Sequence, residues 1–130
     1  MHAKILLAGG EWRPRALVLA QLAEEGYDVT AVETWDEAEL LLRTSATQPA
    51  VVVFDLEGEQ HAQAALSTLG RLAAPGRVLI LTSASILPAA AVRSLGFERV
   101  LARPYSIGDV VKSLSALLRQ PAEPEGCQHD

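Results

Sequence analysis

The stretch VVVFD, residues 51–55, decides the fold of this chain. Four apolar residues in a row, Val51 to Phe54, form the most strand-like run in the sequence and lead directly into Asp55. A continuous apolar run of this length is typical of a strand that is buried on both faces. We therefore predict a strand at 50–55 that carries Asp55 at the rim of its sheet.

Further strands and helices alternate on both sides of this run. We predict strands at 3–8, 27–33, 77–83 and 99–102, and helices at 13–26, 35–42, 61–73, 88–96 and 106–118. Two of these helices begin with a capping-box pattern, formed by Thr34 with Glu37 and by Ser106 with Asp109. Five strands, each followed by a helix, indicate the α/β class.

The predicted architecture is a doubly wound, five-stranded parallel sheet, a (βα)5 fold of the flavodoxin-like type, because strands that alternate with helices pair in parallel through right-handed crossovers. One domain at 1–119 holds all of these elements. The polar, Pro- and Glu-rich residues 120–130 are predicted to be a disordered tail or a linker.

Composition excludes several classes of protein. The 130 residues are 49% hydrophobic and only 5% aromatic, and 11 basic residues stand against 16 acidic ones, a net charge of −5. A nucleic-acid binder usually carries a basic surplus or stripe, which this sequence lacks. No apolar run approaches the roughly 20 residues that span a bilayer, and the single cysteine, Cys127, has no disulfide partner in the chain. We expect a soluble cytoplasmic protein.

The functional crevice of such a sheet lies at the carboxyl ends of its strands. The residues predicted at these ends that carry candidate chemistry are Gly9, Gly10, Glu11, Asp55, Thr82, Arg103 and Pro104. A carboxylate, a hydroxyl and a guanidinium group therefore meet at one edge. The two glycines do not indicate a phosphate cradle, because the sequence has neither a Walker-type Lys with Ser or Thr nor a G-x-G-x-x-G run.

The segments VVVFD, LILTS and VLARPYS resemble the last three strand ends of response-regulator receiver domains, the phosphorylated modules of bacterial two-component phosphorelays. The resemblance covers residues 3 to about 119 and implies the receiver form of the (βα)5 fold. It places Asp55 at the phosphoacceptor position and Thr82 at the switch hydroxyl. Arg103 falls where the family has a phosphate-contacting Lys, and Pro104 is expected to follow a cis peptide bond.

The departures from the family pattern concern the metal. Receivers carry two acidic residues after the first strand that bind Mg²⁺, and Gly9 and Gly10 stand at these positions, with Glu11 adjacent. Mg²⁺ needs carboxylate and water oxygens in octahedral geometry, which glycine cannot supply. We therefore expect no metal site and no cofactor.

Two more departures affect the switch. Val100 stands where the family has an aromatic residue that changes rotamer, and Arg103 replaces Lys. Because Arg forms bidentate pairs with carboxylates, we expect a direct ion pair between Arg103 and Asp55.

These features favour an atypical, non-enzymatic receiver that signals through protein contacts. We expect its partner to be a histidine kinase or another signalling protein, and we expect no direct contact with nucleic acid or membrane. We expect Val100, Leu101 and part of the stripe from Val110 to Leu118 to form an exposed apolar patch. Such a patch would support a homodimer through the fourth helix, fifth strand and fifth helix.

Two alternatives stay open. The first is a receiver that a histidine kinase still phosphorylates on Asp55, with Glu11 as the single metal carboxylate for Mg²⁺. The second is a flavodoxin-like binder of a small ligand, or an enzyme, that uses the same edge. The sequence shows no nucleophile–base pair for catalysis: His2, His61 and His129 lie at the chain start, near a helix start and in the tail.

Overall fold

The computed structural model describes residues 3–9, 13–45 and 48–119 of the chain. The strands are β1 (Lys4–Ala8), β2 (Asp28–Val32), β3 (Val51–Asp55), β4 (Val78–Thr82) and β5 (Arg99–Ala102). The helices are α1 (Arg13–Glu24), α2 (Trp35–Thr44), α3 (Ala62–Leu72), a 3₁₀ turn η1 (Pro75–Arg77), α4 (Ala89–Ser94) and α5 (Ile107–Arg119).

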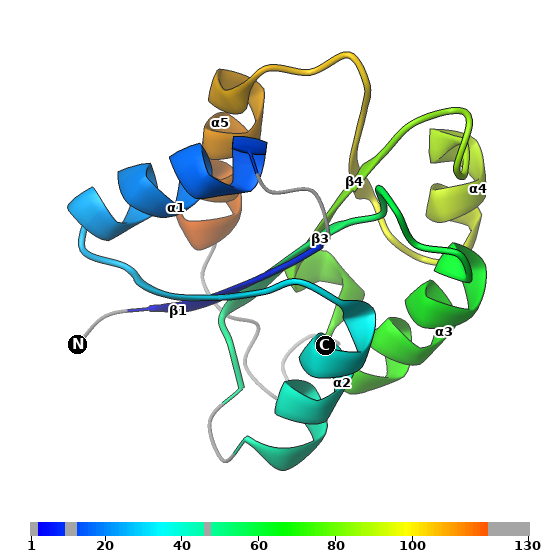
Figure 1. Ribbon diagram of the computed structural model, residues 1–130, viewed down its shortest axis with the longest axis horizontal. Coiled ribbons are helices and arrows are strands. Elements are labelled where there is room, and N and C mark those ends of the chain that lie inside the picture. Colours follow the sequence, from blue (N-terminus) through cyan, green and yellow to red (C-terminus); the bar gives the residue numbers. More distant parts are fainter. Residues whose placement is uncertain (1–2, 10–12, 46–47, 120–130) are drawn as a thin grey trace, which may run out of the picture.

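All five strands form one parallel sheet in the order β2-β1-β3-β4-β5. Helices α1 and α5 cover one face of the sheet, and α2, α3 and α4 cover the other; Figure 1 shows α1 and α5 above the sheet and α2 and α3 below it. The predicted α/β class and the doubly wound receiver-type topology are confirmed.

The sheet separates two apolar cores because successive side chains of a strand point to opposite faces. Val52 and Phe54 of β3 pack toward α2, α3 and α4, whereas Val51 and Val53 pack toward α1 and α5. Every residue of β3 and β4 is buried, as the continuous apolar runs predicted. These two central strands therefore hold Asp55 and Thr82 at well-defined positions.

Both predicted capping boxes are present. The amide of Glu37 donates to Thr34 Oγ1 at 3.2 Å, and the amide of Thr34 donates to Glu37 Oε1 at 3.3 Å. At α5 the amide of Asp109 donates to Ser106 Oγ at 3.0 Å, and the amide of Ser106 donates to Asp109 Oδ2 at 2.9 Å. Each box satisfies amide groups that the first turn of a helix leaves without partners.

The prediction of an exposed apolar patch on β5 and α5 is wrong. Val100 and Leu101 are half-buried, and Val110 is 1% exposed because the apolar stripe of α5 faces the sheet. Among the described residues, the large apolar side chains that are exposed are Leu17 on α1 and Leu40 on α2. The predicted tail, 120–130, lies outside the described residues.

The described helices are short compared with a helix that spans a membrane. The longest helix in the described ranges, α5, has 13 residues, and none of the described helices has the length and hydropathy of a bilayer-crossing segment.

Candidate functional site

Asp55 is the last residue of β3 and lies at the carboxyl edge of the sheet, as predicted. Its side chain is only 7% exposed, and Oδ1 accepts a hydrogen bond from the amide of Glu57 at 3.0 Å. Asp55 lies beside Leu81 of β4, and the amide of the following residue, Leu56, continues the ladder to the carbonyl of Leu81 at 2.9 Å. The backbone is therefore fixed at Asp55 and just after it. The small cavity beside Asp55 is lined by residues of the apolar core under α1 and α5.

Gly9 follows β1 and lies directly against Asp55. A Cβ atom built on Gly9 would come 2.7 Å from Asp55 Cβ and 3.1 Å from the Asp55 carbonyl oxygen. The φ angle of Gly9 is 154°, and its amide donates to the carbonyl of Val32 at 3.2 Å. Position 9 therefore has no room for any side chain while β1 and β3 keep this spacing.

The described residues do not fit a Mg²⁺ ion at Asp55. An acidic side chain at position 9 would collide with Asp55, and no cluster of three or more His, Cys, Asp or Glu able to hold a metal occurs among the described residues. Gly10 and Glu11 lie outside the described ranges, so the expectations for them are untested. The cavity beside Asp55 measures about 20 Å³, room for roughly one water molecule, and the rest of its lining is apolar.

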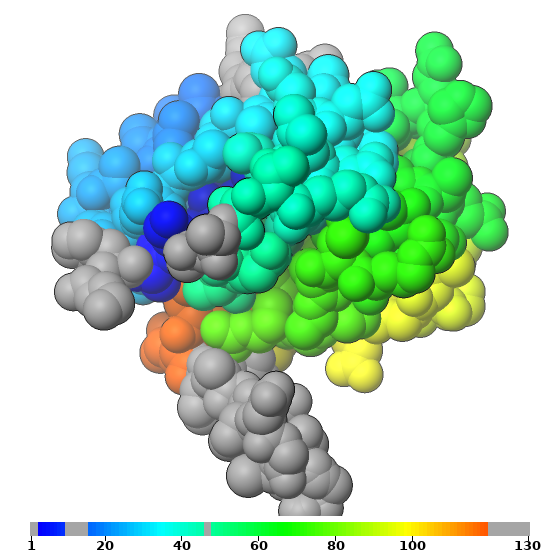
Figure 2. Space-filling model, turned by 90° about the horizontal axis from the view of Figure 1, so that it is seen from below, coloured from blue at the N-terminus to red at the C-terminus, as the bar shows by residue number. Residues whose placement is uncertain are grey.

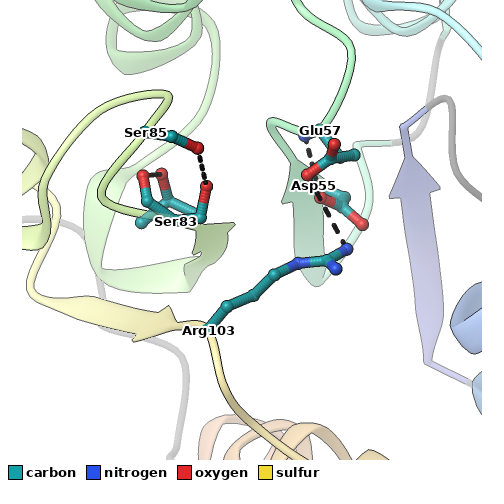
Figure 3. A network of polar contacts seen from close by, with 6 residues as sticks. Asp55, Glu57, Ser83, Ser85 and Arg103 are labelled. Carbon is teal, nitrogen blue, oxygen red and sulfur yellow. Dashed lines mark hydrogen bonds and ion pairs between the residues drawn. The ribbon is translucent and has the colours of Figure 1, made fainter.

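Arg103 follows β5 and extends toward the end of β3, but it does not pair with Asp55 as predicted. Its Nη2 atom lies 3.8 Å from Glu57 Oε1, and the described structure holds no ion pair between Arg103 and Asp55 (Figure 3). The side chains of Arg103 and Glu57 are 44% and 38% exposed. A guanidinium group at Asp55 would have to give up much of this hydration, whereas at Glu57 it stays in water, so the exposed carboxylate is the preferred partner.

Thr82 ends β4 and is 2% exposed. Its hydroxyl donates to the carbonyl of Leu87 at 2.8 Å, a bond that ties the end of the strand to the loop before α4. Val100 of β5 is half-buried and packs against the same core that Phe54 enters. The structure thus places Asp55, Thr82 and Arg103 at one edge of the sheet. The Thr82 hydroxyl is hydrogen-bonded to the loop that follows its own strand.

The cis peptide bond between Arg103 and Pro104 is present, as the family resemblance implied.

Sequence reasoning missed Tyr105, which directly follows Pro104. Its hydroxyl is buried without a hydrogen-bond partner among the described residues, and the Arg103 guanidinium lies 5.8 Å from the centre of its ring. Burial raises the pKa of the Tyr105 hydroxyl, the negative charge of Asp55 adds to the shift, and the charge of Arg103 opposes it. Sequence reasoning also missed Glu57 as the partner of Arg103. Its position two residues after Asp55 places it at the same strand end and could have indicated this role.

Comparisons with known proteins agree with this fold. No protein-family model matches the chain, and no curated protein does. Among solved structures, a response regulator receiver protein from Sinorhizobium medicae WSM419 is 24% identical over 90% of this chain and 94% of that one, with a TM-score of 0.71. The signal receiver domain of a putative Luxo repressor protein from Vibrio parahaemolyticus is 22% identical over 91% of both chains, with a TM-score of 0.73.

A putative response regulator from Chloroflexus aurantiacus J-10-fl is similar over 92% of this chain and 100% of that one, at 17% identity and a TM-score of 0.73. These likenesses show that the chain has the fold of response-regulator receiver domains.

Replacing Gly9 by Ala tests the close contact at Asp55. The added Cβ would overpack a buried site, and we expect the free energy of unfolding to fall by about 1–3 kcal/mol in urea titrations. Gly96→Ala is the matched control: Gly96 also has a positive φ angle, 104°, but a Cβ there meets nothing within 4 Å. Its loss of stability should come from the backbone conformation alone and be smaller than that of Gly9→Ala. Equal effects of the two substitutions would contradict the packing described here.

Replacing Tyr105 by Phe tests the buried hydroxyl. In the unfolded chain Tyr105 loses its proton near pH 10, whereas the raised pKa keeps it protonated to higher pH in the folded protein. The contribution of the protonated Tyr105 hydroxyl to the free energy of unfolding is therefore complete below about pH 10, and it is lost as the pH rises through the pKa of the folded state. We expect wild type to lose more stability than Tyr105→Phe in that window, and the variant to be equal or up to about 1 kcal/mol more stable at neutral pH.

Urea titrations at neutral and alkaline pH measure both effects, with Tyr27→Phe as the control for loss of the other tyrosine. Parallel pH profiles for wild type and Tyr105→Phe would show that the Tyr105 hydroxyl does not titrate differently in the two states.

Proposed function

We propose that this protein is an atypical receiver module of two-component signal transduction that acts through protein contacts and not through Mg²⁺-dependent phosphorylation of Asp55. The observation that carries the proposal is the close packing of Gly9 on Asp55, with 2.7 Å between the two Cβ positions. The receiver fold supports the signalling class, and a histidine kinase or another signalling protein is the proposed partner.

The chemistry of phosphoryl transfer supports this reading. The reaction depends on a divalent ion that neutralises the charge developing on the transferred oxygens. Neither position 9 nor the Arg103–Glu57 pair supplies a free carboxylate for such an ion beside Asp55. We therefore propose that the protein uses no metal. Because the sequence shows no nucleophile–base pair, we also propose that it needs no other cofactor and catalyses no reaction.

The remaining polar groups of the edge support a single resting arrangement. For Thr82 to reach a phosphoryl group, its hydroxyl would have to leave the carbonyl of Leu87. The exposed Arg103–Glu57 pair, 3.8 Å apart, adds little to this constraint. Val100 offers no ring to report such a change. In this proposal the surface presented to a partner does not depend on phosphorylation.

Incubation with acetyl phosphate tests the mechanism. We expect intact-mass spectra to show no phosphoryl adduct that depends on Mg²⁺, with Asp55→Asn and a phosphorylatable receiver as negative and positive controls. A stoichiometric, Mg²⁺-dependent adduct that Asp55→Asn abolishes would overturn the proposal. It would favour the alternative in which a kinase phosphorylates Asp55, a reading supported by the position of Asp55 at the end of β3.

Self-association through α4, β5 and α5 stays a prediction, supported by the family resemblance and without the exposed apolar patch first expected. Exposed side chains of both charges lie on or beside these elements: Arg93 and Lys112 are basic, and Glu98 and Asp109 are acidic. We expect any dimer to be weak and to dissociate with salt, because exposed charge pairs are screened. Sedimentation at low and high salt measures this, and a monomer under both conditions would assign the face to another partner or to none.

A further inference from the structure

A groove separate from the Asp55 site lies between the start of α2 and the segment that leads from β3 into α3. Its volume is about 510 Å³, within the range of roughly 300–1,000 Å³ seen for ligand pockets. Figure 2 faces this side of the molecule and shows α2, in cyan to teal, beside α3, in green. The residues that line the groove are Thr34, Trp35, Asp36, Gly58, Glu59, Gln60, His61, Ala64, Ala65 and Thr68.

One wall of the groove is an aromatic platform. Trp35 is half-buried and stacks on Phe54, with ring centroids 5.4 Å apart and planes inclined by 21°. Phe54 is completely buried in β3, so the indole is held in place by the core. An indole of this kind attracts cations through its ring face, and Trp is the best of the aromatic residues for this contact.

The charge of the groove is negative. Asp36 and Glu59 line it, and none of its lining residues is Lys or Arg. Their carboxylates make no ion pair and no side-chain hydrogen bond with any described residue. Gly58, Ala64 and Ala65 are small, so a partner chain can approach closely between the two helices.

We propose that this groove binds an arginine-bearing segment of a partner protein. A guanidinium group that lies over Trp35 makes a cation–π contact and offers paired N–H donors to the carboxylates of Asp36 and Glu59. The net charge of −5 attracts a basic segment before contact. The proposal does not depend on whether Asp55 is phosphorylated.

The test uses the full chain with Trp12→Phe, which leaves Trp35 as the single tryptophan. Titration with a hexa-arginine peptide should change the Trp35 fluorescence in a saturable way. Asp36→Asn combined with Glu59→Gln should weaken binding about tenfold or more, which corresponds to 1.4 kcal/mol. A hexa-glutamine peptide should give no change.

Two further variants separate the groove from general electrostatics. Glu25→Gln with Glu98→Gln removes the same charge from exposed positions outside the groove and should leave the affinity within about twofold. Ala64→Leu keeps every charge, adds no aromatic ring to the fluorescence signal and narrows the groove, and it should abolish binding. Equal weakening by the two charge-removing pairs, undiminished binding by Ala64→Leu, or the absence of saturable binding would each overturn the proposal.

Discussion

The close approach of β1 and β3 at their carboxyl ends constrains the rest of the candidate site. The two strands are paired in parallel with Ala8 beside Phe54, so the residues that follow them, Gly9 and Asp55, meet at the edge. With only 2.7 Å between Asp55 Cβ and a Cβ at position 9, glycine is the residue that this spacing accepts. A carboxylate side chain at position 9 is incompatible with this packing.

The polar groups of the edge bind to one another and to the backbone. Glu57 donates its amide to Asp55 and accepts Arg103 through its side chain, so one loop contacts both charged residues. Thr82 is held by the carbonyl of Leu87. Tyr105 lies under Arg103, where its buried hydroxyl has no described partner. Asp55, Glu57 and Arg103 are thus linked through one loop, and Thr82 is tied to a different loop.

The proposed groove and the Asp55 edge share a structural origin in β3. Phe54 supports Trp35 at the groove, while the next residue, Asp55, lines the small cavity beside the opposite core. Beyond Glu57 the chain passes directly into Gly58 and Glu59 of the groove wall. A partner bound at the groove would therefore contact the same segment that holds Arg103, which gives the two sites a direct physical connection.

The sequence by itself determined the order of the elements, both capping boxes, the buried central strands and the edge at which Asp55, Thr82 and Arg103 meet. These follow from apolar periodicity and from short-range hydrogen bonds, which act over a few residues. Only the tertiary structure decided which partner Arg103 takes, how close Gly9 lies to Asp55, and that the stripe of α5 is buried. Each of these depends on distances between separate elements and on how exposed each side chain is. Arg103 pairs with the exposed carboxylate of Glu57 and not with the buried one of Asp55, because a charge loses less hydration at an exposed partner.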